Sequence, residues 1–329
     1  MAQEKICIAF IGCGNLANRV HYPSLASFKD VELVACCDLI SERRERTARR
    51  FSISRAYADY RRMIEETSPD AVYAILRPHH LFDPLLWVIQ QGLPVFLEKP
   101  PGVTVGQTRS LARLAEKHSS LTMVGFNRRF IPLLVECRRR VEERGPIIQA
   151  VATFYKHMVD QPQYYDGAVD FLTSDVIHCV DTLRWLGGEV ERVVSDVSWH
   201  YADYPSGFNA LLKFTCPDRQ AREGGATAHL LSSYEVGKRV HTFELHARGI
   251  SAFVDPDSGA RIYADGGAVE EVLDTREVAG SDEFRVYYGF TAEDRHFIDC
   301  VRGGTLPQTH LGDAVKTMEL VDRIYHGQM

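Results

Sequence analysis

Residues 6–17, ICIAFIGCGNLA, decide the fold expected of this chain. The first six form an apolar run of strand length, and the others form a Gly-x-Gly-x-x-Ala turn that opens a helical pattern. Gly12 permits a tight exit from the strand, and Gly14 lacks the Cβ that would hold the backbone away from a pyrophosphate. The stretch therefore predicts a dinucleotide-binding turn, with phosphates at a helix N-terminus. The residues expected at the phosphates are Gly12, Cys13, Gly14, Asn15 and Leu16.

The second strand-like run, residues 31–37 (VELVACC), ends in Asp38. This aspartate follows the glycines by roughly 20 residues, the distance at which an acidic residue meets the ribose hydroxyls of a dinucleotide. A carboxylate there predicts NAD, because it would repel the 2′-phosphate of NADP. Arg43 follows on a charged helix face, which is either a solvated surface or a contact for the adenine or a 2′-phosphate. NADP therefore stays open as the alternative cofactor.

Length and charge indicate an enzyme-sized chain with room for two domains. The chain has 329 residues and a formal net charge of −6, with acidic and basic residues mixed throughout. This pattern gives no extended basic surface, so neither nucleic acid nor a membrane is expected as a partner. The N-terminal apolar run is only of strand length, and no segment approaches the ~20 apolar residues that span a bilayer. The expected location is the cytoplasm.

The cysteines and histidines show no spacing typical of a disulfide framework or a metal site. The eight cysteines contain no CxxC pair, and the thirteen histidines form no HExxH motif. We expect reduced thiols, and the adjacent Cys36 and Cys37 would point to opposite faces of a strand. No metal is predicted.

The spacing of apolar residues changes character near residue 126. Before it, strand patterns alternate with helix patterns, including helices at 60–67, 81–91 and 104–118, which predicts a doubly wound parallel sheet. After it, and after a helix at 131–144, long strand patterns dominate, which predicts a mainly antiparallel sheet. The predicted strands are 147–159, 190–199, 209–216, 226–234 and 242–247, and the remaining helices are 174–186, 292–301 and 312–325. The predicted domains are 1–126, which binds the dinucleotide, and 127–329, which binds the substrate.

Glu98 and Lys99, followed by two prolines, lie at the predicted carboxyl end of a sheet strand. Open α/β sheets bind their ligands at that edge. A partly buried lysine beside a nicotinamide ring could exchange a proton with a hydroxyl or carbonyl near neutral pH. The alternative is a solvated charge pair at a strand end.

Several motifs follow one another along the chain: the glycine turn, Asp38, Glu98-Lys99-Pro100, residues 125–130 (GFNRRF), His178-x-x-Asp181-x-x-x-Trp185-Leu186 and a C-terminal segment at 297–325. In this order and spacing they resemble the glucose-fructose oxidoreductase / inositol dehydrogenase (Gfo/Idh/MocA) family over essentially the whole chain. The resemblance implies a Rossmann domain and a C-terminal α/β domain whose large open sheet commonly forms the oligomer contact, so a homodimer or homotetramer is expected. It also implies reversible hydride transfer between NAD(P) and a secondary alcohol, often on a sugar or cyclitol.

The same resemblance assigns roles to individual residues. Lys99 corresponds to the catalytic lysine, and His178 to the histidine that relays the substrate proton. Where the family usually has an aspartate four residues before this histidine, the chain has Ser174, followed by Asp175. Asp175 is expected to orient the imidazole of His178. The alternative for His178 is an ordinary core or surface histidine. The alternative for Asp175 is an acid that the helix dipole favours in a first helical turn.

Further candidate residues at the cofactor are identified by their positions after predicted strands. Arg77 and Pro78 come directly after a strand, where the family passes its backbone beside the cofactor, and Asn127 belongs to the fourth motif. We expect these three residues and Glu98 at the cofactor, although a surface role for Arg77 is equally open. Residues 161–170, QPQYYDGAVD, offer tyrosine faces and polar tips suited to a polyol or keto-sugar, or they form an ordinary loop.

Two rival functions remain. One is a family member that retains NAD and breaks a glycosidic bond through transient oxidation. The other is a dinucleotide-binding regulator without activity. The presence of Lys99 and His178 argues against a regulator, whereas the displaced aspartate argues for one.

Overall fold

The computed structural model describes residues 4–215 and 225–327, which divide into two compact units. The first unit holds the residues through Asn127 together with Phe284–Val286 and Phe290–Lys316. The second holds Arg128–Glu283, Tyr287–Gly289 and the residues from Thr317 on. The predicted domains were single continuous segments, 1–126 and 127–329. The structure differs because a late segment returns to the first unit, where Arg295 forms an ion pair with Asp30 at 2.9 Å.

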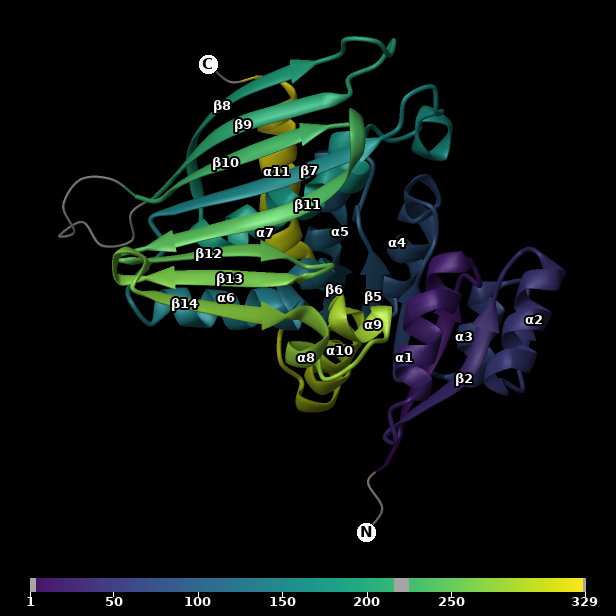
Figure 1. The fold of residues 1–329 in the computed structure, drawn as a ribbon. Coiled ribbons are helices and arrows are strands. Elements are labelled where there is room, and N and C mark those ends of the chain that lie inside the picture. Colours follow the sequence, from purple (N-terminus) through teal and green to yellow (C-terminus); the bar gives the residue numbers. More distant parts are fainter. Residues whose placement is uncertain (1–3, 216–224, 328–329) are drawn as a thin grey trace. The chain divides into compact units, whose positions relative to one another are not determined.

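The first unit is built on a parallel sheet of six strands in the order β3-β2-β1-β4-β5-β6, of which β2, β5 and β6 are labelled in Figure 1. All its pairings are parallel, which confirms the predicted doubly wound sheet. The strand order reverses between β1 and β4, and right-handed crossovers from that point place helices on both faces. The strands are β1 (Ile6–Ile11), β2 (Val31–Cys37), β3 (Ala56–Tyr57), β4 (Ala71–Ala74), β5 (Val95–Glu98) and β6 (Thr122–Gly125).

Strands β4, β5 and β6 are buried along their whole length, as expected for a parallel sheet covered on both faces. Aromatic rings fill the core around β1, β4 and β5. Phe10 stacks on Tyr73 with ring centroids 5.0 Å apart, and Tyr73 stacks on Phe96 at 4.7 Å. This packing fixes the strand ends from which the candidate site is built.

The helix after the glycine turn is not a regular α-helix. It begins at residue 15, passes through a π-helical turn, η1 (Ala17–His21), and continues as α1 (Tyr22–Ala26). The helices predicted at 60–67, 81–91 and 104–118 are present with ends that agree within one residue. They and their neighbours are α2 (Ser41–Phe51), α3 (Tyr60–Thr67), η2 (Pro78–His80), α4 (Phe82–Gln90), α5 (Val105–Lys117) and α10 (Phe290–Gly303).

The second unit is built on an eight-stranded sheet in the order β14-β13-β12-β11-β7-β10-β9-β8. Its pairings are antiparallel except between β7 and β10, which confirms the mainly antiparallel prediction. The predicted series stopped at residue 247 and missed the last three strands; residue 216, the end of another predicted strand, lies outside the described residues. The strands are β7 (Gln149–His157), β8 (Val190–Ser198), β9 (Gly207–Phe214), β10 (Thr227–Ser233), β11 (Glu235–Ala247), β12 (Ile250–Asp255), β13 (Gly259–Ala264) and β14 (Val269–Asp274).

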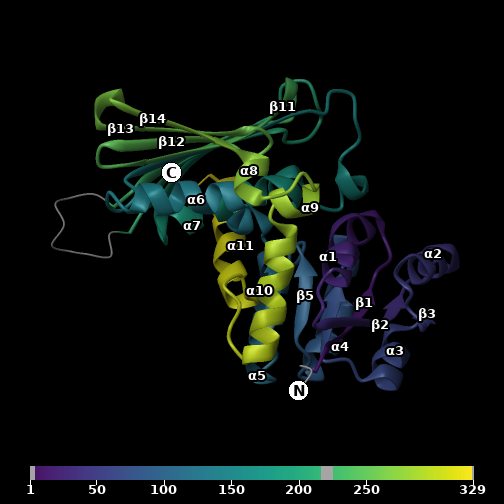
Figure 2. The same cartoon turned by 60° about the horizontal axis from the view of Figure 1, so that its bottom comes forward.

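Helices α6 (Pro132–Glu142) and α7 (Ile177–Gly187) cover one face of this sheet (Figure 2). The other elements of the unit are η4 (Tyr164–Gly167), η5 (Leu172–Val176), η6 (Asp265–Gly267) and α8 (Thr275–Ala279). Three elements contain residues of both units: η3 (Asn127–Phe130), α9 (Phe284–Tyr287) and α11 (Leu311–Tyr325). Within the described ranges, no helix combines the length and the apolar character needed to cross a membrane.

Candidate active site

The glycine turn after β1 has the geometry that the sequence predicts for binding an anion. Gly12 adopts φ +113°, and a Cβ there would lie 2.2 Å from the carbonyl oxygen of Ile75. A Cβ on Gly14 would meet nothing within 4 Å, so the space above the turn is open. The first N–H groups of the following helix have no carbonyl one turn earlier to bond. These residues fit a dinucleotide pyrophosphate.

Asp38 lies beside this turn. Its Oδ2 accepts the backbone N–H of Cys13 at 2.9 Å, and its Oδ1 accepts that of Ile40 at 2.9 Å. The carboxylate is therefore held at the edge of the sheet where a ribose is expected. Arg44 donates to the carbonyl of Asp38 at 3.2 Å, whereas Arg43 is exposed in the first turn of α2.

The sequence analysis missed two features of the region around Asp38 and the glycine turn. Leu39 is 86% exposed and Ile40 is 45% exposed, so an apolar surface follows directly on Asp38. The thiol of Cys13 is buried and lies 3.5 Å from the hydroxyl of Tyr22. Only the backbone of Cys13 therefore borders the open side of the turn.

The structure also locates the predicted site residues that follow β4 and β6. Arg77 is exposed and precedes η2, whose first residue, Pro78, is buried. Both follow β4 at the edge that carries the glycine turn. Asn127 is buried and lies two residues after Gly125, the last residue of β6. Their predicted contacts with the cofactor stay predictions.

Glu98 ends β5 and is buried, with 4% of its surface exposed. Its Oε2 accepts the backbone N–H of the half-buried Lys99 at 3.1 Å. Its Oε1 lies 3.0 Å from Nε2 of His21. Glu98 thus holds the backbone of Lys99 in place, while its predicted contact with the cofactor stays a prediction. The Lys99–Pro100 peptide bond is cis.

In the second unit, His178 is the second residue of α7 and is 3% exposed. Asp175 lies just before it in the π-helical turn η5. Oδ2 of Asp175 accepts a hydrogen bond from the Tyr234 hydroxyl at 2.9 Å and forms an ion pair with Lys156. The structure therefore brings Asp175 together with two residues that sequence reasoning did not connect to it. Its predicted role in orienting His178 stays a prediction.

Lys156 lies on β7 and is largely enclosed by aromatic rings. Its Nζ lies 5.1, 5.4 and 5.9 Å from the ring centroids of Phe154, Tyr164 and Tyr234, and it donates to the Tyr164 hydroxyl at 3.1 Å. Burial alone lowers the pKa of Lys156, but the Asp175 carboxylate outweighs it and raises the pKa above its usual value. Lys156 is therefore a permanent cation in an aromatic box.

The predicted specificity segment, residues 161–170, contributes Tyr164 to this box. The chain reaches it through η4, in which Tyr165 and Asp166 adopt φ +56° and +57°. Non-glycine residues rarely adopt this left-handed conformation, and such strain concentrates at functional sites. Burial raises the pKa of Tyr164 above its usual value, so its hydroxyl stays protonated at neutral pH.

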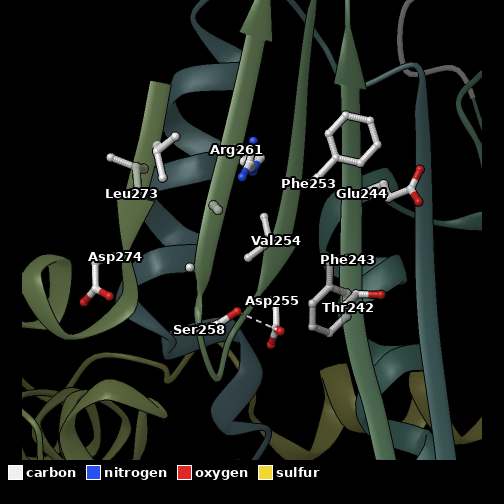
Figure 3. A pocket seen from close by; sticks show the side chains of 13 residues that line it. Thr242, Phe243, Glu244, Phe253, Val254, Asp255, Ser258, Arg261, Leu273 and Asp274 are labelled. Atoms are coloured by element: carbon white, nitrogen blue, oxygen red, sulfur yellow. Dashed lines mark hydrogen bonds between the residues drawn. The ribbon is translucent and has the colours of Figure 1, made fainter. Parts of the chain in front are cut away.

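A separate pocket of about 500 Å³ lies on the second unit's sheet across β11 to β14 (Figure 3). Phe253 and Arg261 project into it from neighbouring strands, and Ser258, in the turn between β12 and β13, donates to Asp255 at 2.8 Å. It contains none of the predicted site residues. Among the described residues, no three His, Cys, Asp or Glu side chains are grouped to hold a metal, and the seven described cysteines are free thiols.

Comparison with known proteins agrees with this geometry. Residues 6–126 match the family model described as the oxidoreductase family with an NAD-binding Rossmann fold. Over this stretch the chain belongs to the Gfo/Idh/MocA family, and it is an NAD(P)-dependent oxidoreductase.

Two curated relatives span nearly the whole chain. The D-apiose dehydrogenase of Paraburkholderia graminis is 26% identical, covering 96% of this chain and 86% of that protein. The NAD⁺-dependent scyllo-inositol 2-dehydrogenase of Bacillus subtilis is 21% identical, covering 97% of this chain and 92% of that protein. A crystal structure of a dehydrogenase from Chromobacterium violaceum matches with a TM-score of 0.85 at 22% identity, over 98% of this chain and 95% of that chain. This last match shows the shared fold.

Proposed function

We propose that the chain transfers hydride between NAD and a secondary alcohol or ketone of a sugar, cyclitol or related polyol. The observation that carries this proposal is Lys99, which follows the buried Glu98 at the ligand-binding edge of the first unit's sheet. The named relatives support the substrate class, since one is a D-apiose dehydrogenase and the other a scyllo-inositol 2-dehydrogenase.

In this proposal, two residues transfer the proton of the substrate hydroxyl. In the oxidising direction, the neutral amine of Lys99 takes the hydroxyl proton as the alcohol becomes a carbonyl and passes it to His178; in the reducing direction, the protonated Lys99 returns a proton to the carbonyl oxygen. A nicotinamide bound beside Lys99 would supply or accept the hydride. Asp175 supports His178 from the turn before α7.

The preference for NAD over NADP rests on Asp38. Both of its carboxylate oxygens are hydrogen bonded to backbone N–H groups, so its charge is held at the ribose position. A second negative group there would be repelled. The exposed Arg43 is the group that would have to offset this repulsion in NADP binding.

The ammonium of Lys156 supplies a substrate contact in this proposal. It is fixed by Asp175 and by the hydroxyl of Tyr164, so it can donate to a hydroxyl oxygen without first being ordered. Aromatic walls with one charged and several polar groups suit a polyhydroxylated ring.

The outer face of the second unit's sheet is the proposed contact between copies, giving a homodimer or homotetramer. One row of paired residues crosses all eight strands on this face. The row is Val194, Leu211, His229, Val151, Glu244, Phe253, Arg261 and Val272. Five of these eight residues are apolar, with Phe253 42% exposed and Val272 66% exposed, and exposed apolar patches mark interaction surfaces.

The test is the Lys99→Ala variant, assayed by NADH formation with a panel of sugars and inositols. We expect NAD binding within a few-fold of wild type and turnover lower by roughly 10²- to 10⁴-fold, because only the proton transfer group is removed. Lys117→Ala, an exposed lysine at the end of α5, is the matched control and should be unchanged. Near-normal turnover of Lys99→Ala would overturn the assignment.

The same assay separates the rival functions. Product without net NADH would identify a chain that retains NAD and cleaves a glycosidic bond. Binding of NAD with no turnover of any polyol would identify a regulator. Net NADH formation that depends on Lys99 supports the dehydrogenase.

A further inference from the structure

His21 is a buried histidine to which the proposed reaction assigns no role. It ends the π-helical turn η1, and its side chain is fully buried. Its Nδ1 lies 2.9 Å from Oδ1 of Asp294 on α10, and its Nε2 lies 3.0 Å from Oε1 of Glu98 on β5. One imidazole thus joins three elements of the first unit that are far apart in the sequence.

The two partners determine the protonation of this ring. Ionised carboxylates only accept hydrogen bonds, so a ring that is bonded to one through each nitrogen must carry both protons. Burial by itself lowers the pKa of His21, but Asp294 and Glu98 outweigh it and raise the pKa to about 10. Burial also raises the pKa of Asp294, while the facing His21 ring lowers it, so the two groups stabilise each other's charged forms. With Glu98 bonded to its other nitrogen, the ring is an imidazolium at neutral pH, among Tyr73, Phe96 and Phe290.

The contact with Glu98 reaches Lys99 in one further step. The second oxygen of Glu98 accepts the N–H of Lys99, and the carboxylate packs against Gly125, where a Cβ would lie 3.1 Å from it. Because the neighbouring strand leaves no room and both oxygens are bonded, the carboxylate has one orientation. That orientation sets where the backbone of Lys99 leaves the sheet.

The π-helical turn explains how His21 reaches this position. A π-turn inserts one residue into a helix and so rotates the side chains on either side of it by about 100° relative to a regular helix. The insertion lies between the glycine turn and His21. The helix can then present its N-terminus to the phosphates and still direct His21 toward β5. Insertions of this kind are frequent at functional sites.

We propose that His21 is a positioning residue for the catalytic lysine: its doubly bonded ring clamps Glu98, and through Glu98 it ties the backbone of Lys99 to the helix that receives the cofactor phosphates. The part that concerns catalysis rests on the proposed role of Lys99. The clamp itself is independent of that role.

The test uses Asp294→Asn, which keeps the size of the side chain and removes its charge. Asp299→Asn, an exposed aspartate on the same helix, is the matched control. In nitrogen-15 spectra of the wild type, we expect two strongly downfield ring N–H protons from His21 that persist from pH 6 to pH 9. Asp294→Asn should lose one of them and shift the backbone amide of Lys99, and Asp299→Asn should do neither.

Kinetics supply the second readout. We expect Asp294→Asn to lower kcat about 10- to 100-fold with KM for NAD nearly unchanged, as for partners that orient a functional group. Its pH profile should gain an ionisation, because a ring with one carboxylate titrates within the accessible range. A merely structural role would instead lower the melting temperature and leave kcat per folded molecule and its pH profile unchanged, which would overturn the proposal.

Two further outcomes are decisive. Loss of a ring proton from wild-type His21 below pH 7 would refute the clamp. If Asp294→Asn fails to fold, His21→Leu serves in its place, since its side chain cannot donate to Glu98, and an unmoved Lys99 amide there would also refute the clamp. Absence of wild-type turnover with every polyol would sink the proposed function alone, since the spectra test the clamp without activity.

Discussion

At the scale of single residues, the glycine turn gives the sharpest contrast, because Gly12 and Gly14 need to lack a Cβ for different reasons. At Gly12 a Cβ would collide with the carbonyl of Ile75, in a backbone conformation with φ +113°. At Gly14 a Cβ would enter open space. The first glycine is required by the fold, and the second is required only by a ligand.

This contrast predicts different phenotypes for two alanine variants. Gly12→Ala should lower the melting temperature and NAD affinity together, since the strand exit must shift. Gly14→Ala should melt like the wild type and bind NAD at least about tenfold more weakly, because its Cβ holds the pyrophosphate away. Calorimetric titration and thermal melts measure both. Wild-type affinity for NAD in Gly14→Ala would contradict the placement of the phosphates.

Lys156 is the other residue with a specific expectation. Lys156→Met keeps the length of the side chain and removes its charge, leaving Asp175 with the Tyr234 hydroxyl. We expect KM for the polyol to rise about 10- to 100-fold, since a charged hydrogen bond contributes roughly 1.5–3 kcal/mol, while NAD affinity is unchanged. Lys213→Met on β9 is the control. Unchanged KM for every polyol in Lys156→Met would remove this residue from the substrate site.

At the scale of elements, local sequence patterns predicted most of the helices and strands that such patterns can specify by themselves. Strands β1 and β2 and helices α3, α4 and α5 are specified by apolar spacing and by end signals, such as the Thr104 side chain that accepts the N–H of Gln107. The π-helical turns η1 and η5 were not predicted. Each depends on what its side chains reach, and those partners are distant in sequence.

The residues of the candidate site divide in the same way. Gly12, Asp38 and Lys99 follow strands and could be named from position alone. His21 could not, because its partner Asp294 is 273 residues away. The pairing of Lys156 with Asp175 was also invisible, since it depends on how β7 packs against η5 and not on either segment alone. The strands β12 to β14 were missed because short runs between turn residues carry little periodicity.

At the scale of the whole molecule, the open question is how many copies associate. The row across the outer face of the eight-stranded sheet predicts a contact between copies. The double variant Phe253→Glu, Val272→Glu should convert a dimer or tetramer into a monomer, because charges buried in an apolar contact are costly. Leu306→Glu, an exposed leucine of the first unit, is the control. Light scattering that finds a wild-type monomer, or an unchanged assembly in the double variant, would contradict the contact.

We propose above that Lys99 and His178 act on one substrate oxygen. A crystal structure of the protein with NAD⁺ and a polyol that it turns over tests this directly. We expect Nζ of Lys99 and a ring nitrogen of His178 within roughly 2.6–3.2 Å of the same hydroxyl oxygen, or joined to it through one water. A structure with either side chain turned away from that oxygen, or with the two approaching different groups of the ligand, would contradict it.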